Sequence, residues 1–79
     1  MPLEKIFSTA DIALSAVLKI KEFKLTRINR DSGKTFFVFE DKPDRSDLVM
    51  RFVNREMLVE PIRFMEEIRN LKSLTRQED

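Results

Sequence analysis

The sequence predicts an α+β fold in which a two-stranded antiparallel hairpin packs with three helices, in the order helix, strand, strand, helix, helix. Apolar residues recur at helical spacing in three segments, the only glycine lies between two strand-like segments, and prolines precede two of the helical segments. The length of 79 residues fits one small domain over 1–79, with flexible ends expected at 1–6 and 75–79.

The first helix is predicted from about Thr9 to Lys21. Ser8 is the expected N-cap, and Asp11 three residues later forms an acidic variant of the capping box. Apolar side chains make a stripe broader than a coiled-coil seam, so we expect this helix to be covered on more than one side. They are Ile12, Ala13, Leu14, Ala16, Val17, Leu18 and Ile20.

A β-hairpin is predicted next, with strands over 24–30 and 35–40 and a turn that contains Gly33. Four consecutive apolar residues in the second strand place aromatic side chains on both faces of the sheet. One face is expected to meet the helices, and the other needs a cover from this chain or from a partner. We therefore interpret this run as a candidate protein interface. Its members are Phe36, Phe37, Val38 and Phe39.

Two further helices follow the hairpin. Pro43 or Asp44 begins the first of them, which is expected to end near Asn54 in a left-handed cap. Pro61 begins the last helix at the position that proline favours. The predicted apolar face of that helix contains Phe64, Met65, Ile68, Leu71 and Leu74. The pair Arg63 and Glu67 is expected on the solvated face.

The chain is expected not to be an enzyme and to need no cofactor. Histidine and cysteine are absent from the sequence, which removes the commonest general base, the thiol nucleophile and almost every zinc site. A single glycine excludes the glycine-rich phosphate-binding motifs. The acidic set Asp41, Asp44 and Asp47 is interpreted as complementing a helix dipole rather than as a magnesium site. No small-molecule substrate is apparent.

The charges are nearly balanced, with 15 Lys and Arg against 14 Asp and Glu. Such a balance gives the protein as a whole no strong electrostatic potential that would favour nucleic-acid binding. Basic residues nevertheless gather near the hairpin, and the candidates for nucleic-acid contact are Lys24, Arg27, Arg30 and Lys34. Their other interpretation is solubility and protection of the sheet edge. A second basic set on the last helix, Arg63, Arg69, Lys72 and Arg76, is expected to form no single stripe.

The sequence also bears on the compartment. No apolar run approaches the roughly 20 residues of a membrane span. The absence of cysteine fits a reducing environment. We therefore expect a cytoplasmic protein without membrane contact.

Three segments carry a resemblance to a known family. They are Phe7, Thr9, Asp11 and Leu14; Phe37-Val38-Phe39; and Val59-Glu60-Pro61 with Phe64-Met65, Ile68, Leu71 and Lys72. In these residues the chain resembles small bacterial domains of unknown function that are often encoded near mobile genetic elements. Family members often have a glycine where Arg55 stands, so either the positive-φ turn is lost or Asn54 supplies it. The resemblance implies one compact bacterial domain and no activity.

Two functional hypotheses follow from the sequence. The first is a non-enzymatic interaction domain that self-associates or docks on a larger protein, and it rests on the aromatic strand. The alternative is a small nucleic-acid-binding accessory or regulatory protein of a mobile element, and it rests on the basic residues of the hairpin.

Overall fold

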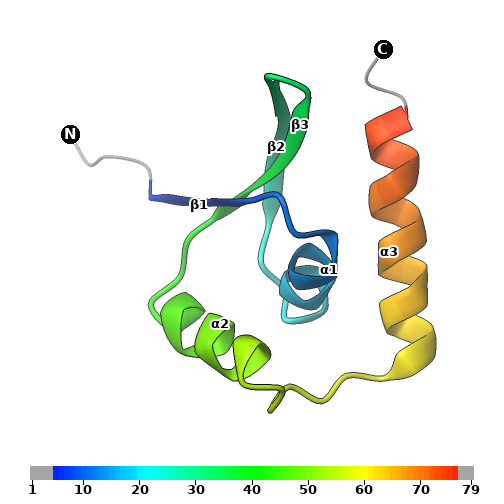
Figure 1. The fold of residues 1–79 in the computed structure, drawn as a ribbon. Coiled ribbons are helices and arrows are strands. Elements are labelled where there is room, and N and C mark those ends of the chain that lie inside the picture. Colours follow the sequence, from blue (N-terminus) through cyan, green and yellow to red (C-terminus); the bar gives the residue numbers. More distant parts are fainter. Residues whose placement is uncertain (1–4, 77–79) are drawn as a thin grey trace.

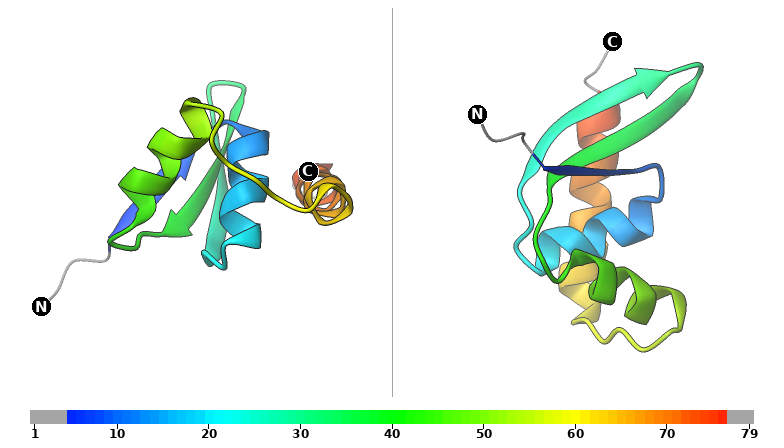
Figure 2. Two further views of the ribbon diagram at one scale, coloured as in Figure 1. Left: turned by 90° about the horizontal axis from the view of Figure 1, so that it is seen from below. Right: turned by 90° about the vertical axis from the view of Figure 1, so that its left-hand side faces the viewer.

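A computed structural model describes residues 5–76 and contains three strands and three helices (Figure 1). The elements are β1 (Ile6–Thr9), α1 (Ile12–Ile20), β2 (Leu25–Asp31), β3 (Lys34–Glu40), α2 (Arg45–Val53) and α3 (Pro61–Arg76). The strands form one antiparallel sheet in the order β1-β3-β2. The three helices lie together on one side of this sheet (Figure 2, right). The fold is therefore α+β, with one face of the sheet free of helices.

The predicted two-stranded sheet is wrong, because a third strand precedes the first helix. β1 pairs with β3 and places Phe7 opposite Phe39 and Ser8 opposite Val38. Since β1 has only four residues, its alternation is too short to stand out in the sequence. The order of elements is strand, helix, strand, strand, helix, helix.

The start of α1 also differs from the prediction, because Ser8 belongs to β1 and is not the N-cap. Asp11 is the N-cap, and its carboxylate accepts a hydrogen bond from the backbone N–H of Leu14 at 3.0 Å. The buried hydroxyl of Ser15 donates to the Asp11 carbonyl oxygen at 2.8 Å. A single aspartate thus fixes the first turn of the helix.

The predicted hairpin is confirmed. Ser32 and Gly33 both have positive φ, 53° and 84°, as the two central residues of a type I′ turn require. A bulge at Thr26 lets Leu25 pair with Phe39 and Arg27 pair with Val38. The bulge explains why the apolar residues of β2 do not alternate strictly.

The core lies between the sheet and the helices. Five consecutive residues of α1, Leu14 to Leu18, are buried, and α1 packs between the sheet and α3 (Figure 1). Leu48 of α2 and Leu71 of α3 complete the same cluster from the two flanking helices. The strands contribute Phe37 and Phe39 to it.

Two helices end in the same hydrogen-bonded turn, and in each a non-glycine residue takes the left-handed conformation. After α1, Glu22 has φ 68° and the N–H of Phe23 donates to the Leu18 carbonyl at 2.9 Å. After α2, Arg55 has φ 61° and the N–H of Glu56 donates to the Arg51 carbonyl at 2.8 Å. Both are Schellman motifs.

The predicted left-handed cap at Asn54 is wrong, because Asn54 has φ −84° and the next residue, Arg55, has the positive φ. The position at which the resembling family often carries glycine therefore keeps the glycine-like conformation. An L-residue with a Cβ adopts this conformation at a cost of about 1 kcal/mol.

The buried face of α3 differs from the prediction. Met65 is 55% exposed and Leu74 is 39% exposed, so neither belongs to the core. Glu67, expected on the solvated face, is only 9% exposed. Its Oε2 accepts a hydrogen bond from Arg63 Nε at 3.3 Å, and its Oε1 has no partner among the described residues. The face that packs inward contains Phe64, Glu67, Ile68 and Leu71.

Parts of the two predicted flexible ends belong to regular elements. Ile6 is in β1, and Thr75 and Arg76 close α3. The remainder of these two predictions, apart from Lys5, falls on 1–4 and 77–79, which lie outside the described residues. Within the described part of the chain, no helix is long and apolar enough to span a bilayer.

Candidate docking surface

The aromatic strand that the sequence offers as an interface is mostly enclosed by its own chain. Phe37 and Phe39 face the helices and are 3% and 0% exposed. Val38 points to the opposite side of the sheet, and it is also 0% exposed because neighbouring side chains cover it. Phe36 shares that side and is half-buried. Of the four residues, Phe36 alone offers surface to a partner.

The basic residues of the hairpin do not gather on one face. Arg27 and Lys34 lie on the helix-free side of the sheet, to judge from their register with Val38 and Asp31. Arg30 lies on the other side, and its guanidinium donates to the carbonyl oxygen of Thr75 at the end of α3. Lys24 precedes β2. The structure therefore divides this predicted nucleic-acid site between two faces.

Three of the large exposed apolar side chains lie in the connector and the first turns of α3, in addition to two on α2. Leu58 is 88% exposed, Ile62 67% and Met65 55%. We call these three residues the apolar strip. They follow one another along the connector and the first two turns of α3, opposite the face that carries Phe64 and Leu71. Isolated exposed apolar residues are ordinary, but a contiguous set often marks a binding surface.

The apolar strip was not predicted from the sequence, because Met65 was assigned to the core. The signal that could have found it is the start of the helix at Pro61. With 3.6 residues per turn, positions 62 and 65 then lie on the side opposite 64, 67 and 71.

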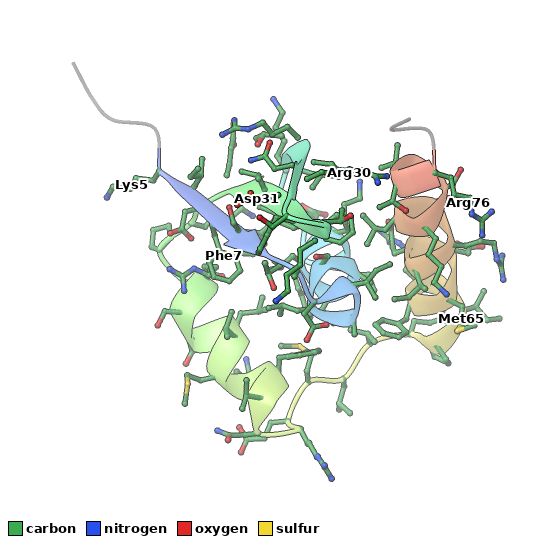
Figure 3. All side chains as sticks on the ribbon, turned by 45° about the horizontal axis from the view of Figure 1, so that its top comes forward. Lys5, Phe7, Arg30, Asp31, Met65 and Arg76 are labelled. Carbon is green, nitrogen blue, oxygen red and sulfur yellow. The ribbon has the colours of Figure 1, made fainter. Side chains whose placement is uncertain are left out.

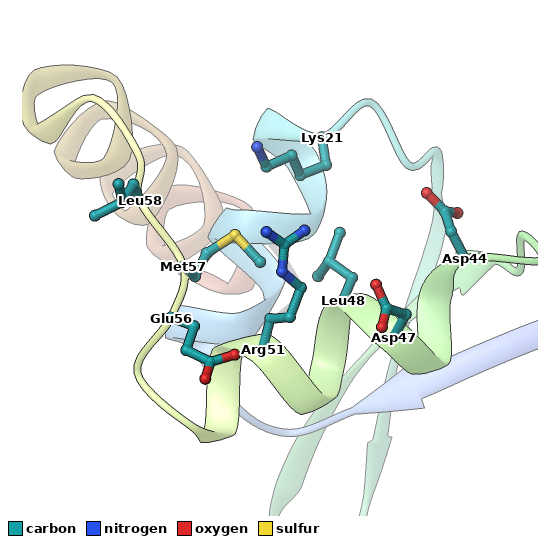
Figure 4. A pocket seen from close by; sticks show the side chains of 8 residues that line it. All are labelled: Lys21, Asp44, Asp47, Leu48, Arg51, Glu56, Met57 and Leu58. Carbon is teal, nitrogen blue, oxygen red and sulfur yellow. The ribbon is translucent and has the colours of Figure 1, made fainter.

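A groove of about 390 Å³ adjoins the strip at Leu58, between the end of α1, α2 and the connector (Figure 4). Leu48 and Met57 supply its apolar lining. The Schellman turn at Arg55 reverses the chain so that the connector returns beside α2. The full lining is Lys21, Asp44, Asp47, Leu48, Arg51, Glu56, Met57 and Leu58.

Charges of both signs surround the groove. Lys21 and Arg51 supply cations, while Asp44 and Asp47 lie toward the first turns of α2 (Figure 4). Among the described residues, the ion pairs are Arg45–Asp41 and Arg63–Glu67, so none of the groove charges is paired. A groove lined by five charged and three apolar residues suits an amphipathic polypeptide segment, which brings apolar groups and counter-charges together.

A cluster at the start of α2 has a structural role. Arg45 Nε lies 3.0 Å from Asp41 Oδ1, and its guanidinium lies over the Phe7 ring, 4.3 Å from the centroid. Lys42 Nζ lies 4.6 Å from the centroid of Phe23. The hydrogen bond from Arg45 is the main reason why the pKa of Asp41 is lowered. These contacts attach α2 to β1 and to the end of α1.

A metal centre would need several ligating side chains close together. No group of three or more histidine, cysteine, aspartate or glutamate side chains among them is placed to hold a metal ion. The surface features that remain are the apolar strip, the groove beside it and the cations of α3.

The comparisons with known proteins place the chain in a family. The family model of a domain of unknown function, DUF5659, matches residues 4–77. The chain therefore belongs to this family. No curated protein and no solved structure matches it.

Proposed function

We propose that this DUF5659 domain is a non-enzymatic interaction domain that binds another polypeptide through the apolar strip and the adjoining groove. The polypeptide is either a second copy of the chain or a larger protein. The observation that carries the proposal is the exposure of Leu58, Ile62 and Met65 within the connector and the first turns of α3.

The strip supports docking better than the sheet does. The aromatic residues of β3 already fill the core, so withdrawing them to meet a partner would expose it. A partner can cover the strip without breaking core contacts of the domain, because the three side chains of the strip are largely in solvent. Covering apolar surface stabilises a complex by about 25 cal/mol per Å² before the entropic costs of association.

The groove supplies the specificity that an apolar strip lacks. A partner side chain that enters beside Leu48 and Met57 meets Arg51 and Lys21 at the rim. A carboxylate on the partner can pair with these cations, and a partner cation can pair with the three carboxylates of the same lining. The proposal therefore favours a partner segment that combines apolar residues with charges of both signs.

Site-specific photo-crosslinking tests the proposal. The photoreactive residue p-benzoylphenylalanine is placed at Ile62 in the cells that make the protein, and adducts are identified after irradiation. We expect a specific adduct whose mass shows a second copy or a larger protein. The control is the same residue at Asn29, an exposed position on the helix-free side of the sheet.

The outcomes separate the alternatives. An adduct from position 62 that is absent from position 29, and that disappears when Leu58 and Met65 are changed to serine, supports docking through the strip. Equal adducts from both positions, or none from position 62, would contradict it. Because the strip is exposed, the serine changes should leave the circular dichroism spectrum unchanged.

The cellular setting of the domain is part of the proposal. A bacterial cytoplasm, with the coding sequence near a mobile genetic element, is what the resemblance and the lack of cysteine support. Fractionation of cells that express the chain at its native level tests the compartment.

A further inference from the structure

We propose that α3 also binds the phosphate backbone of nucleic acid, through a basic stripe formed by Arg69, Lys72 and Arg76. This surface lies beyond the apolar strip along the same helix. It differs from the set that the sequence suggested on the hairpin, and it does not depend on the proposed protein docking.

Helical geometry brings the three cations to one side of α3. With about 100° per residue, positions 69, 72 and 76 fall within about 60° of one another. All three side chains are exposed, while Leu71 on the opposite side is 0% exposed. Of the four basic residues that were expected to spread around this helix, only Arg63 lies away from the stripe.

The stripe is not neutralised by carboxylates within the described residues. Ion pairs form there at Arg45–Asp41 and Arg63–Glu67, and neither involves the stripe. Glu67 faces inward, so Glu66 is the acidic side chain of α3 nearest to Arg69 on the exposed side. Glu78 and Asp79 follow in the sequence, outside the described residues.

A second observation enlarges this surface at the end of α3. Arg30 of the hairpin reaches the Thr75 carbonyl there (Figure 3). Arg30, Thr35, Thr75 and Arg76 line an open hollow of about 620 Å³. None of these side chains is a carboxylate, and although the Thr75 hydroxyl already donates to the Lys72 carbonyl oxygen, the two guanidinium groups keep further N–H donors that can meet a phosphate group.

The dimensions suit a nucleic-acid strand. Residues 69 and 76 are about 10 Å apart along the helix axis, a distance over which one strand of a DNA duplex places about three phosphates. With Arg30 included, four cations can make contacts. Point charges of this kind contact phosphates rather than base edges, so we expect recognition of the backbone without sequence preference.

Fluorescence anisotropy with a labelled 20-base-pair DNA duplex of mixed sequence tests the proposal. At 50 mM salt we expect a dissociation constant in the micromolar range and a slope of log affinity against log salt of about −3 to −4. The variant R69Q/K72Q/R76Q should bind at least about 10-fold more weakly, with a slope reduced by about 3.

The control variant K24Q/R27Q/K34Q removes the same net charge from exposed positions on and beside the hairpin. It should leave the slope unchanged and alter the affinity less than about 3-fold, since its residues make no backbone contact in this proposal. Circular dichroism should show that both variants are folded.

Three results would overturn the proposal. The first is no binding by the unaltered chain at 200 µM. The second is an equal or larger loss in the control variant, which would move the contact to the hairpin. The third is displacement of the duplex by polyglutamate of matched charge concentration as efficiently as by unlabelled DNA, which would identify the stripe as a site for acidic protein.

Discussion

The helices α1 and α3 pack against each other but differ in what they bury. α1 has nine residues, and the five from Leu14 to Leu18 are all buried. α3 has 16 residues, of which only Glu67 and Leu71 are buried. The comparison shows that α1 is the centre of the core. In contrast, α3 packs against the core through a narrow face, and most of its surface is exposed to solvent. Both surfaces that we propose for binding are on α3 or next to it.

The test with the largest expected change in stability is a pair of alanine substitutions. Leu18→Ala in α1 should lower the free energy of unfolding by about 3 kcal/mol, because the side chain is fully buried. Met65→Ala in α3 should lower it by less than about 1 kcal/mol, because the side chain is mostly exposed. Urea unfolding followed by circular dichroism measures both. Equal losses would show that α3 is as much a part of the core as α1.

A second test concerns the buried carboxylate of α3. Glu67→Met should raise the free energy of unfolding by about 1 kcal/mol, because it removes an oxygen without a partner and keeps a side chain of similar length. Thermal unfolding compares it with Glu66→Met, an exposed neighbour that should have little effect. A loss of stability in the first variant would mean that Glu67 stabilises the fold in its charged form.

The two Schellman turns provide a third test. Glu22→Gly after α1 and Arg55→Gly after α2 should each raise stability by about 0.5 kcal/mol, because glycine relieves the left-handed strain and loses some of that gain to chain entropy. Chemical unfolding measures the change. Glycine at Lys21, where φ is −84°, serves as the control and should be destabilising.

The smallest expected effect concerns Asp41. Its pKa is lowered in the folded state, chiefly by the hydrogen bond from Arg45. The stabilisation is therefore present above the ordinary pKa of 3.8 and is lost as the pH falls through the folded-state pKa. Asp41→Asn should cost about 0.5 kcal/mol at pH 7. The difference from the unaltered chain should shrink as the pH falls below 3.8, as measured by thermal unfolding across the pH range.

Local signals predicted much of the fold. Gly33 indicated the position of the hairpin turn, because glycine readily adopts positive φ. Pro61 indicated the start of the last helix, because proline fixes φ near the helical value. The bulge at Thr26 was not predicted, since only the pairing with β3 shows that one residue is extra. The residues of β1 were assigned to a flexible end and to the start of the first helix, because a four-residue strand has no independent signal.

The candidate surfaces were harder to predict for the same physical reason. An amphipathic segment such as 61–76 contains apolar residues on more than one side, and tertiary packing decides which side is buried. Here Glu67 is inside and Ile62 is outside, contrary to their polarity. The sequence alone therefore assigned Met65 to the core and Glu67 to solvent.

The order β1-β3-β2 also has a consequence for how the chain folds. The β2–β3 hairpin closes through a two-residue turn and can form early, whereas β1 must wait for a strand about 30 residues further along. Closing that long loop costs conformational entropy before any β1 contact repays it. We therefore expect hydrogen exchange during refolding to protect the amides of β2 and β3 first, and those of β1 last.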